Sequence, residues 1–341
     1  MNLRTTPTHT VKTCGLQLGA TLAASLLLLA AARNTRAELL IGLTTQNNLI
    51  SFDSATPGTI NTIGTISGLT AGDTLVGIDR RPQHLAGSSL PGPNNGRIFA
   101  VGVNFTGGSA RIYTLSEFDA AAMLLSTLAP DPADVVAPFP FTTVSGTSFG
   151  VDFNPVPDRL RVTSNTGQNL RINVDNGLVQ LDVPLAYQAG DPNFGDAPFE
   201  VAVAYSNNFG GATSTTLRGV DIGQLSDALV IHTNPNGGLL QTSLDLSFNS
   251  TSTAAYDISG ITGTPYFAIQ SPESFVSSLY SSGPGGVTLT GTIGGGVPLI
   301  GLAAPVGAPI PEPGGLGLLA LALTLLTGRK VGSSYADLGE S

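Results

Sequence analysis

The sequence predicts an all-β fold, a β-propeller-like array of five to seven four-stranded repeats. Helical periodicity is nearly absent between residues 38 and 295, and short β-branched runs alternate there with Gly, Asn, Asp and Pro. A Gly-x-Asp sequence also returns in steps of about 36 residues. A 41% share of apolar residues is enough to fill a core. A signal peptide and a C-terminal apolar helix are expected to flank the array.

Residues 1–37 have the features of a secretory signal peptide. A positively charged start precedes the apolar segment Leu16–Ala32, and a small-x-Ala sequence ends at Ala37. We therefore expect signal peptidase to cut after Ala37; a cut nearer Ala32 and an uncleaved anchor are the alternatives. Cleavage would remove Cys14, the one cysteine, so the exported domain must rely on its core and not on disulfides.

The repeated unit of residues 38–295 begins at a Gly-x-Asp sequence or a close variant. Four such sequences end at Asp79, Asp152, Asp221 and Asp257, with Gly42-Leu43-Thr44 as a weaker first member. Strands and turns follow, and Asp175-Asn176-Gly177 predicts a tight hairpin. Four-stranded antiparallel sheets at this spacing are typical of propeller blades, because each sheet buries its faces against its neighbours. Paired β-sandwiches and a solenoid without ring closure are the alternatives.

Ser116–Leu128 is the one segment of this domain with helical character. Its sequence, SEFDAAAMLLSTL, begins with a candidate N-cap at Ser116 and places Asp119 in the first turn. We therefore expect a short helix here.

A long string of the chain carries a resemblance. Residues 149–162 read F-G-V-D-F-N-P-V-P-D-R-L-R-V, and G-Q-N-L-R at 167–171 and A-Y-S-N-N at 204–208 follow. With these strings the chain resembles an uncharacterised bacterial domain-of-unknown-function family of secreted, propeller-like proteins, over most of residues 38–275. The resemblance implies export and a repeated β architecture. It implies no activity and brings no catalytic residues.

The C-terminal end resembles a sorting tail. Residues 296–313 are a Gly/Pro-rich linker that ends in Pro311, Glu312 and Pro313, and residues 314–341 hold an apolar run and a basic pair. This order resembles the PEP-CTERM tail of Gram-negative envelope proteins, which implies cleavage by an exosortase-type processing enzyme. Here the chain continues for 11 residues beyond the basic pair, unlike most tails of that family. A single-pass transmembrane anchor is the alternative.

Charge excludes one class of partner. The net charge is -9, and residues 38–313 contain 8 Arg, no Lys and 21 Asp plus Glu, which gives 8 minus 21, or -13. A nucleic-acid binder needs clustered Lys and Arg, so no nucleic acid is expected. The expected location is the outer envelope surface or the extracellular space.

Three arginines offer a candidate contact with an acidic sugar. Alternation along a strand places Arg159 and Arg161 on one face, and Arg171 joins them across a hairpin. The trio would suit an acidic exopolysaccharide. The alternative is that the arginines pair with Asp158 and Asp175 on a solvated face.

No catalytic constellation is evident. The mature chain has two histidines, His84 and His232, and neither has a second His or Cys at ligand spacing, so no zinc site is expected. Both are expected at the surface or at a strand end. The expected function is an exported cell-surface or matrix-associated module, either binding or structural. The alternative is an extracellular metal-dependent hydrolase or lyase that acts at the propeller channel.

One candidate metal site remains. If the Gly-x-Asp sequences lie in the innermost strands, Asp79, Asp152, Asp221 and Asp257 would form an acidic ring at the channel. Converging carboxylates repel one another, and calcium would neutralise them through oxygen ligands. The alternative is that each Asp ends its strand and accepts a hydrogen bond from the turn two residues on.

Overall fold

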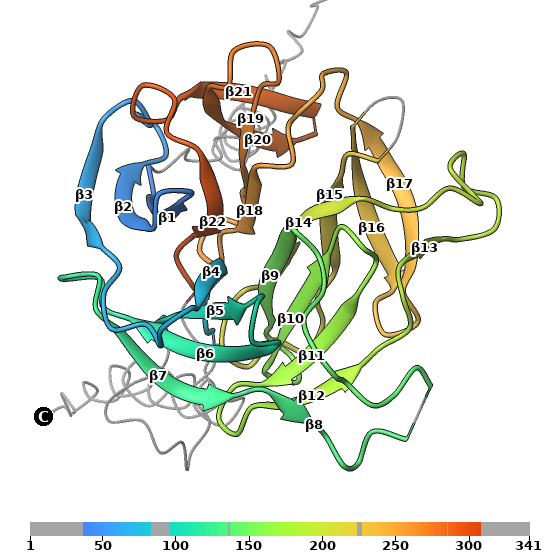
Figure 1. The fold of residues 1–341 in the computed structure, drawn as a ribbon. Coiled ribbons are helices and arrows are strands. Elements are labelled where there is room, and N and C mark those ends of the chain that lie inside the picture. The colour runs from blue at the N-terminus through green and yellow to red at the C-terminus, as the bar shows by residue number, and fades with distance from the viewer. Residues whose placement is uncertain (1–36, 83–95, 136, 224–226, 285, 308–341) are drawn as a thin grey trace, which may run out of the picture. The chain divides into compact units, whose positions relative to one another are not determined.

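The computed structural model describes residues 37–82, 96–135, 137–223, 227–284 and 286–307. The strands of these residues form five sheets, and the described part of the chain contains no helix. Figure 1 shows the sheets arranged side by side around a common centre. The predicted all-β propeller is therefore confirmed, with five blades.

Each blade has four main strands, and two blades carry a short extra edge strand. Blade 1 contains β22 (Leu299–Ala303), β1 (Leu39–Thr44), β2 (Asn48–Asp53) and β3 (Ile60–Thr65). Blade 2 contains β4 (Thr74–Arg80), β5 (Ile98–Asn104), β6 (Ser109–Leu115) and β7 (Ala122–Thr127). Blade 3 contains β9 (Phe149–Asn154), β10 (Arg159–Ser164), β11 (Asn169–Asn173), β12 (Leu178–Leu181) and the edge strand β8 (Ala129–Pro130). Blade 4 contains β14 (Glu200–Tyr205), β15 (Leu217–Asp221), β16 (Ala228–Asn234), β17 (Leu239–Asp245) and the edge strand β13 (Ala186–Tyr187). Blade 5 contains β18 (Ala254–Ile258), β19 (Pro265–Gln270), β20 (Ser277–Gly283) and β21 (Gly286–Thr292).

The ring is closed. The innermost strands β4, β9, β14, β18 and β22 contact one another in that order, and β22 contacts β4 again. Blade 1 closes the circle because β22 pairs antiparallel with β1, with Ile41 opposite Ala303. Figure 1 shows the blue strands of blade 1 beside the red β22. The segment expected as a linker, 296–313, thus contains a strand of the propeller.

The hairpins follow the turn chemistry of the sequence. The turn at Asp175-Asn176-Gly177 joins β11 to β12 as predicted, with the Gly177 N–H donated to the Asn173 carbonyl and a φ of +75° at Gly177. The two edge strands pair differently: β8 runs parallel to β12 and β13 parallel to β17. Each leaves one blade and adds to the outer edge of the next, so neighbouring blades are tied at their rims.

The prediction of a helix at Ser116–Leu128 is wrong. Ala120 has a left-handed φ of +59°, and Ala122–Thr127 forms β7, which pairs with β6. A residue with positive φ interrupts a right-handed helix, and pairing with β6 satisfies the backbone groups that a helix would have satisfied internally. Tertiary pairing therefore overrides the local preference of an alanine-rich segment.

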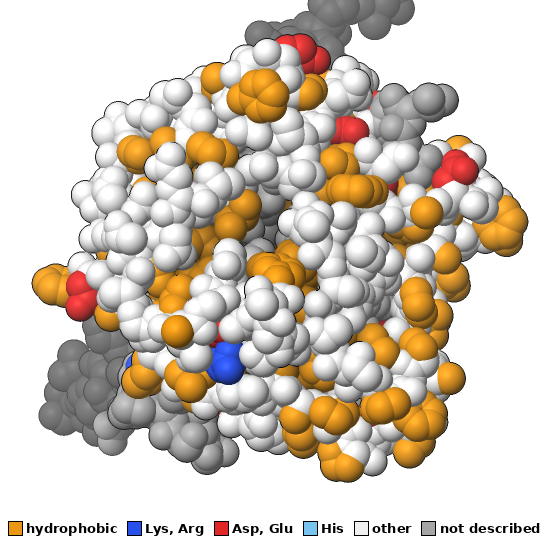
Figure 2. All heavy atoms as spheres, in the orientation of Figure 1, with side chains coloured by type: hydrophobic (Ala, Val, Ile, Leu, Met, Phe, Trp, Pro, Cys, Tyr) orange, Lys and Arg blue, Asp and Glu red, His pale blue; other side chains and the backbone are white. Residues whose placement is uncertain are grey.

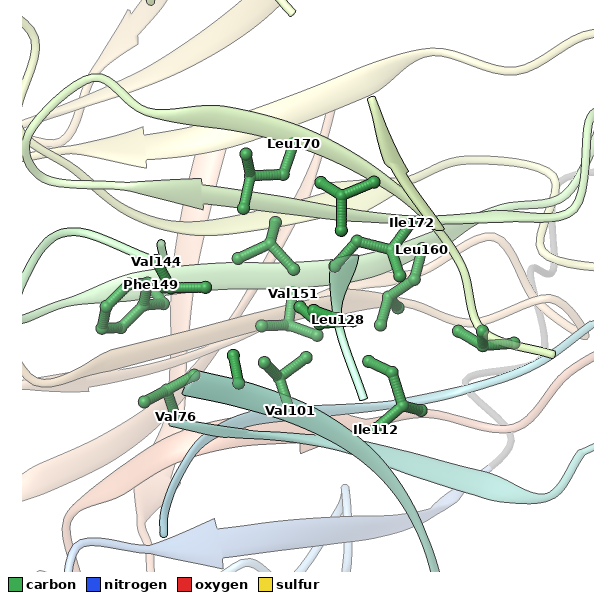
Figure 3. Close-up of a cluster of buried hydrophobic side chains, with 14 of the residues drawn as sticks. Val76, Val101, Ile112, Leu128, Val144, Phe149, Val151, Leu160, Leu170 and Ile172 are labelled. Carbon is green, nitrogen blue, oxygen red and sulfur yellow. The ribbon is translucent and has the colours of Figure 1, made fainter. Parts of the chain in front are cut away.

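Apolar side chains fill the spaces between the blades. Figure 3 shows the cluster between blades 2 and 3, where Val76, Val101 and Ile112 face Val151 and Leu160. Similar clusters lie between blades 1 and 2, 5 and 1, and 4 and 5. Because each sheet buries its faces against its neighbours, the core is distributed around the ring.

Both predicted targeting segments lie outside the described residues. The described residues begin at Ala37 and end at residue 307. They therefore exclude residues 1–36, Pro311, Glu312, Pro313 and the apolar run that follows. The described part of the chain holds no helix long and apolar enough to cross a membrane.

Candidate functional site

A pocket lies where the innermost strands begin. It has a volume of about 270 Å³. Its lining comes from all five blades and consists of Thr45, Thr74, Leu75, Val76, Phe105, Thr147, Ser148, Phe149, Val201, Ser252, Thr253, Ala254 and Ile300. We call it the mouth pocket. Because every blade contributes to it, the pocket exists only in the closed ring.

The mouth pocket is uncharged and rich in hydroxyl groups. Among the described residues, its lining contains six Ser or Thr and no Asp, Glu, Lys, Arg or His. Phe105, which is 53% exposed, stands beside Phe149 with 6.3 Å between the ring centroids. Figure 2 shows a hollow near the middle of the ring with hydrophobic side chains inside it, on a face with few charged side chains. Such a surface offers aromatic contact area and hydroxyl hydrogen bonds.

A narrow passage continues inward from the pocket. Its volume is about 10 Å³, which is room for roughly one water molecule. Glycines let the innermost strands approach this closely: a Cβ on Gly77 would lie 2.4 Å from Val151 Cγ2, and one on Gly150 would lie 2.7 Å from the Val203 nitrogen. The repeated glycine of the Gly-x-Asp sequence therefore makes room for the next blade.

Three of the four predicted aspartates meet near the far ends of the innermost strands. Asp79 on β4, Asp152 on β9 and Asp257 on β18 each place one carboxylate oxygen within 4.8 Å of the other two. All three residues are 0% exposed. We call them the Asp triad. Carboxylate oxygens in this arrangement have the chemistry to hold a hard cation.

Each aspartate of the triad also binds the backbone of the next blade. Asp79 accepts the Phe153 N–H at 2.7 Å, Asp152 accepts the Tyr205 N–H at 2.9 Å, and Asp257 accepts the Ala304 N–H at 2.5 Å. In blade 3, the N–H partner Phe153 directly follows the aspartate position, Asp152. In blades 4 and 1, the residues directly before the N–H partners Tyr205 and Ala304 are Ala204 and Ala303, so these two alanines occupy the equivalent positions. Five equivalent positions thus carry three aspartates and two alanines.

Burial dominates the electrostatics of the triad. It raises the pKa of Asp79, Asp152 and Asp257 above the usual range, because a low-dielectric interior disfavours the charged form. Repulsion between the carboxylates raises the pKa of Asp79 and Asp152 further, whereas their backbone N–H partners lower it.

Asp221 does not join the triad. It lies on β15, the second strand of blade 4, which runs antiparallel to the innermost strand β14. Its carboxylate is therefore at the opposite end of the blade, where it accepts the N–H groups of Gly223 and Phe199 at 2.9 Å each. The bond from Gly223, two residues on, is the turn contact given as the alternative for all four aspartates. Burial raises the pKa of Asp221 to about 6.

The arginine trio is paired, with different partners from those expected. Arg161 is 2% exposed and donates to Asp182 at 2.6 Å, and Arg171 donates to the same carboxylate. Arg159 donates to the Asp158 backbone carbonyl at 3.0 Å and not to its carboxylate. With Asp182 between them, Arg161 and Arg171 form a link within blade 3 instead of an open cationic face.

His232 is buried, contrary to the expected surface or strand-end position. Its Nε2 lies 2.7 Å from Glu200 Oε1, and both side chains are fully buried. The pair lies within the sheet of blade 4 and none of its atoms lines the mouth pocket. His84 is outside the described residues.

The sequence contained a pattern that would have located the mouth pocket. Thr74, Thr147 and Ser252 each stand five positions before an aspartate of the triad. They mark the ends of the innermost strands that open into the pocket. An alignment of the repeats on these aspartates would have brought the three hydroxyl residues into one column.

A family model for a domain of unknown function, DUF4394, matches residues 48–303. This match confirms the expected relation to a domain-of-unknown-function family over that range. A search of curated proteins found no match.

Solved structures with a similar fold include proteins of varied description. One is a protein of unknown function from Bacteroides thetaiotaomicron, with 13% identity, a TM-score of 0.42, and coverage of 75% of this chain and 58% of that chain. Another is regucalcin, a calcium-binding protein from Agrobacterium tumefaciens, with 11% identity, a TM-score of 0.36 and 78% coverage of each chain. A third is the major Malassezia sympodialis allergen Mala s 1, with 10% identity, a TM-score of 0.35, and coverage of 75% and 86%. This chain thus spans 58% of the first of these proteins, and the likenesses carry no argument about ligand or activity.

Proposed function

The chain belongs to the DUF4394 family of domains of unknown function, and we propose that it is an exported β-propeller that binds an uncharged part of a glycan in its mouth pocket. The observation that carries the proposal is the lining of this pocket, in which the described residues combine six hydroxyl side chains with Phe105 and include no charged group. Sugars present hydroxyl groups and apolar C–H faces, so they match such a surface. Fold alone would not assign this role.

The pocket favours binding over catalysis. Hydrolysis or elimination needs a general acid or base, a nucleophile or a metal in contact with the substrate. In the part of the chain that the structure describes, no titratable side chain lines the mouth pocket, and the Asp triad is separated from it by a passage of about 10 Å³. A metal-dependent hydrolase or lyase acting at the channel is therefore the weaker proposal.

Export is the second part of the proposal and rests on the sequence. The signal-peptide features of residues 1–37 and the Pro311-Glu312-Pro313 tail support processing by signal peptidase and an exosortase-type enzyme. A location at the envelope surface, with a transient or permanent C-terminal anchor, would place the mouth pocket among exopolysaccharides. An uncharged sugar suits the pocket better than the acidic sugar considered for the arginines, because Arg161 and Arg171 are already paired with Asp182.

Binding of the full chain to an array of neutral and acidic glycans tests the proposal. We expect neutral glycans to bind, and Phe105→Ala to weaken the tightest of them by about tenfold or more, because an aromatic contact at the pocket is lost. Phe275→Ala is the matched control, since Phe275 is also exposed but lies in a turn of blade 5 outside the pocket. Absence of glycan binding, or equal binding by both variants, would refute the proposed site.

A further inference from the structure

We propose that Asp79, Asp152 and Asp257 hold one hard divalent cation of the calcium class, which ties blades 2, 3 and 5 together inside the ring of innermost strands. This site is distinct from the mouth pocket, and the proposal does not depend on what binds there.

The spacing of the ligand atoms fits a single ion. One oxygen of each carboxylate lies within 4.8 Å of the other two. Calcium binds oxygen at about 2.3–2.6 Å, so two oxygens on opposite sides of the ion are about 4.6–5.2 Å apart. The three oxygens can therefore surround one ion without a rearrangement of the strands.

Asp152 supplies a second observation. Its Oδ1 accepts the Tyr205 N–H, whereas its Oδ2 accepts from no N–H or hydroxyl donor among the described residues, although the residue is 0% exposed. The Asp152 side chain can share a hydrogen bond with that of Asp257 only when one of the two carboxyls is protonated. A buried charged oxygen without a partner is costly, and such atoms call for an explanation such as a bound ion. When the carboxyls are ionised, a cation between them supplies the partner that Oδ2 then lacks.

Among the described residues, no arginine or histidine forms an ion pair with a carboxylate of the triad. Arg80, which follows Asp79, pairs its guanidinium with Glu117, and from there its charge lowers the pKa of Asp79 and Asp257. Three buried carboxylates thus carry negative charge that the neighbouring side chains do not pair. A bound cation or bound protons would relieve the repulsion that Arg80 does not offset.

Position in the ring gives the ion its role. Each aspartate comes from a different blade, and Ala204 and Ala303 at the two other equivalent positions are small side chains. An ion here would join strands that are far apart in the sequence, and it would stabilise only the folded, closed ring. By mass action its binding must therefore raise the melting temperature.

Calcium binding and melting of the full chain test the site together. After treatment with a chelator, equilibrium dialysis with radioactive calcium should give one tightly bound ion per chain that Asp152→Asn removes. About 1 mM calcium should raise the melting temperature by about 5 °C or more over the chelated protein, and sodium at equal ionic strength should not. Magnesium in place of calcium measures how far the site discriminates between the two ions.

Asp221→Asn is the matched control, because Asp221 is equally buried but lies outside the triad; it should keep the ion and the melting shift. If Asp152→Asn does not fold, Asp79→Asn replaces it in the same comparison. A parent protein without a bound ion, or a triad variant that keeps it, overturns the proposal. A parent protein that is stabilised by acid but does not respond to calcium also overturns it, because this is the behaviour of a proton shared between Asp152 and Asp257.

Discussion

The guanidinium of Arg81 in blade 2 donates through Nε to both carboxylate oxygens of Asp158 in blade 3, at 3.0 and 3.1 Å. Arg81 is 1% exposed and Asp158 2% exposed, so the pair is fully buried between two blades. Asp175 accepts from the same guanidinium at 2.8 Å, and the rings of Phe99 and Phe153 lie beside it. Contacts between blades are thus made by ion pairs as well as by apolar packing.

Loss of this arginine should destabilise the ring. Arg81→Met leaves the Asp158 carboxylate buried without its cation, and we expect a loss of about 3–5 kcal/mol in the free energy of unfolding. Glu117→Gln removes the partner of Arg80 at the surface and should cost less than about 1 kcal/mol. Urea denaturation of both variants measures the difference; equal costs would show that the buried pair contributes no more than a surface pair.

The glycine of the repeat should tolerate no side chain. Gly77→Ala places a Cβ 2.4 Å from Val151 Cγ2 on the next blade, so we expect a loss of stability of about 1–3 kcal/mol from overpacking. Gly283→Ala is the control, because no atom lies within 4 Å of a Cβ there, and it should change stability by less than about 0.5 kcal/mol. Similar melting temperatures for the two variants would contradict the close approach of the blades.

Asp221 should make stability depend on pH in a defined direction. Its pKa is about 6 in the folded protein and 3.8 ordinarily. Below pH 3.8 the group is protonated in both states and contributes nothing. Between pH 3.8 and 6 only the unfolded chain releases the proton, so stability falls as pH rises, by about 3 kcal/mol in total.

Asp221→Asn removes this titration. The difference in free energy of unfolding between the variant and the parent should therefore shift by roughly 2 kcal/mol in favour of the variant between pH 4 and pH 7. Denaturation curves at several pH values measure that difference. A difference that stays constant with pH would mean that Asp221 titrates normally.

The blade architecture was predictable because it depends on local chemistry. Short β-branched runs, the hairpin at Asp175-Asn176-Gly177 and the returning Gly-x-Asp sequence all reflect strands and turns that each blade repeats. Which strand of each blade carries the repeated sequence was harder to predict. Asp221 and Gly42-Leu43-Thr44 lie on the second strands β15 and β1 and not on innermost strands. The innermost strands β14 and β22 have alanine at the position of the aspartate, so the Gly-x-Asp pattern does not mark them.

Ring closure and the partners of buried charges could not be predicted from the sequence. β22 joins β1 across almost the whole length of the domain, and no local pattern records such a pairing. The same holds for Arg161, whose partner Asp182 lies 21 positions away, and for His232, whose partner Glu200 lies 32 positions away. Long-range pairs of this kind are fixed by the folded ring, whereas the approach of Asp79, Asp152 and Asp257 followed from the repeat itself.

Hydrogen–deuterium exchange with and without a bound neutral glycan tests the central claim, that the ligand site is the mouth pocket built by the closed ring. Mass spectrometry of the full chain should show slower exchange in segments that are far apart in the sequence but meet at the pocket. These segments surround Thr45, Thr74, Phe105, Thr147 and Ser252. Slower exchange confined to the outer strands, or to the hollow of blade 2 lined by Arg97, Glu117 and Asp119, would contradict the account.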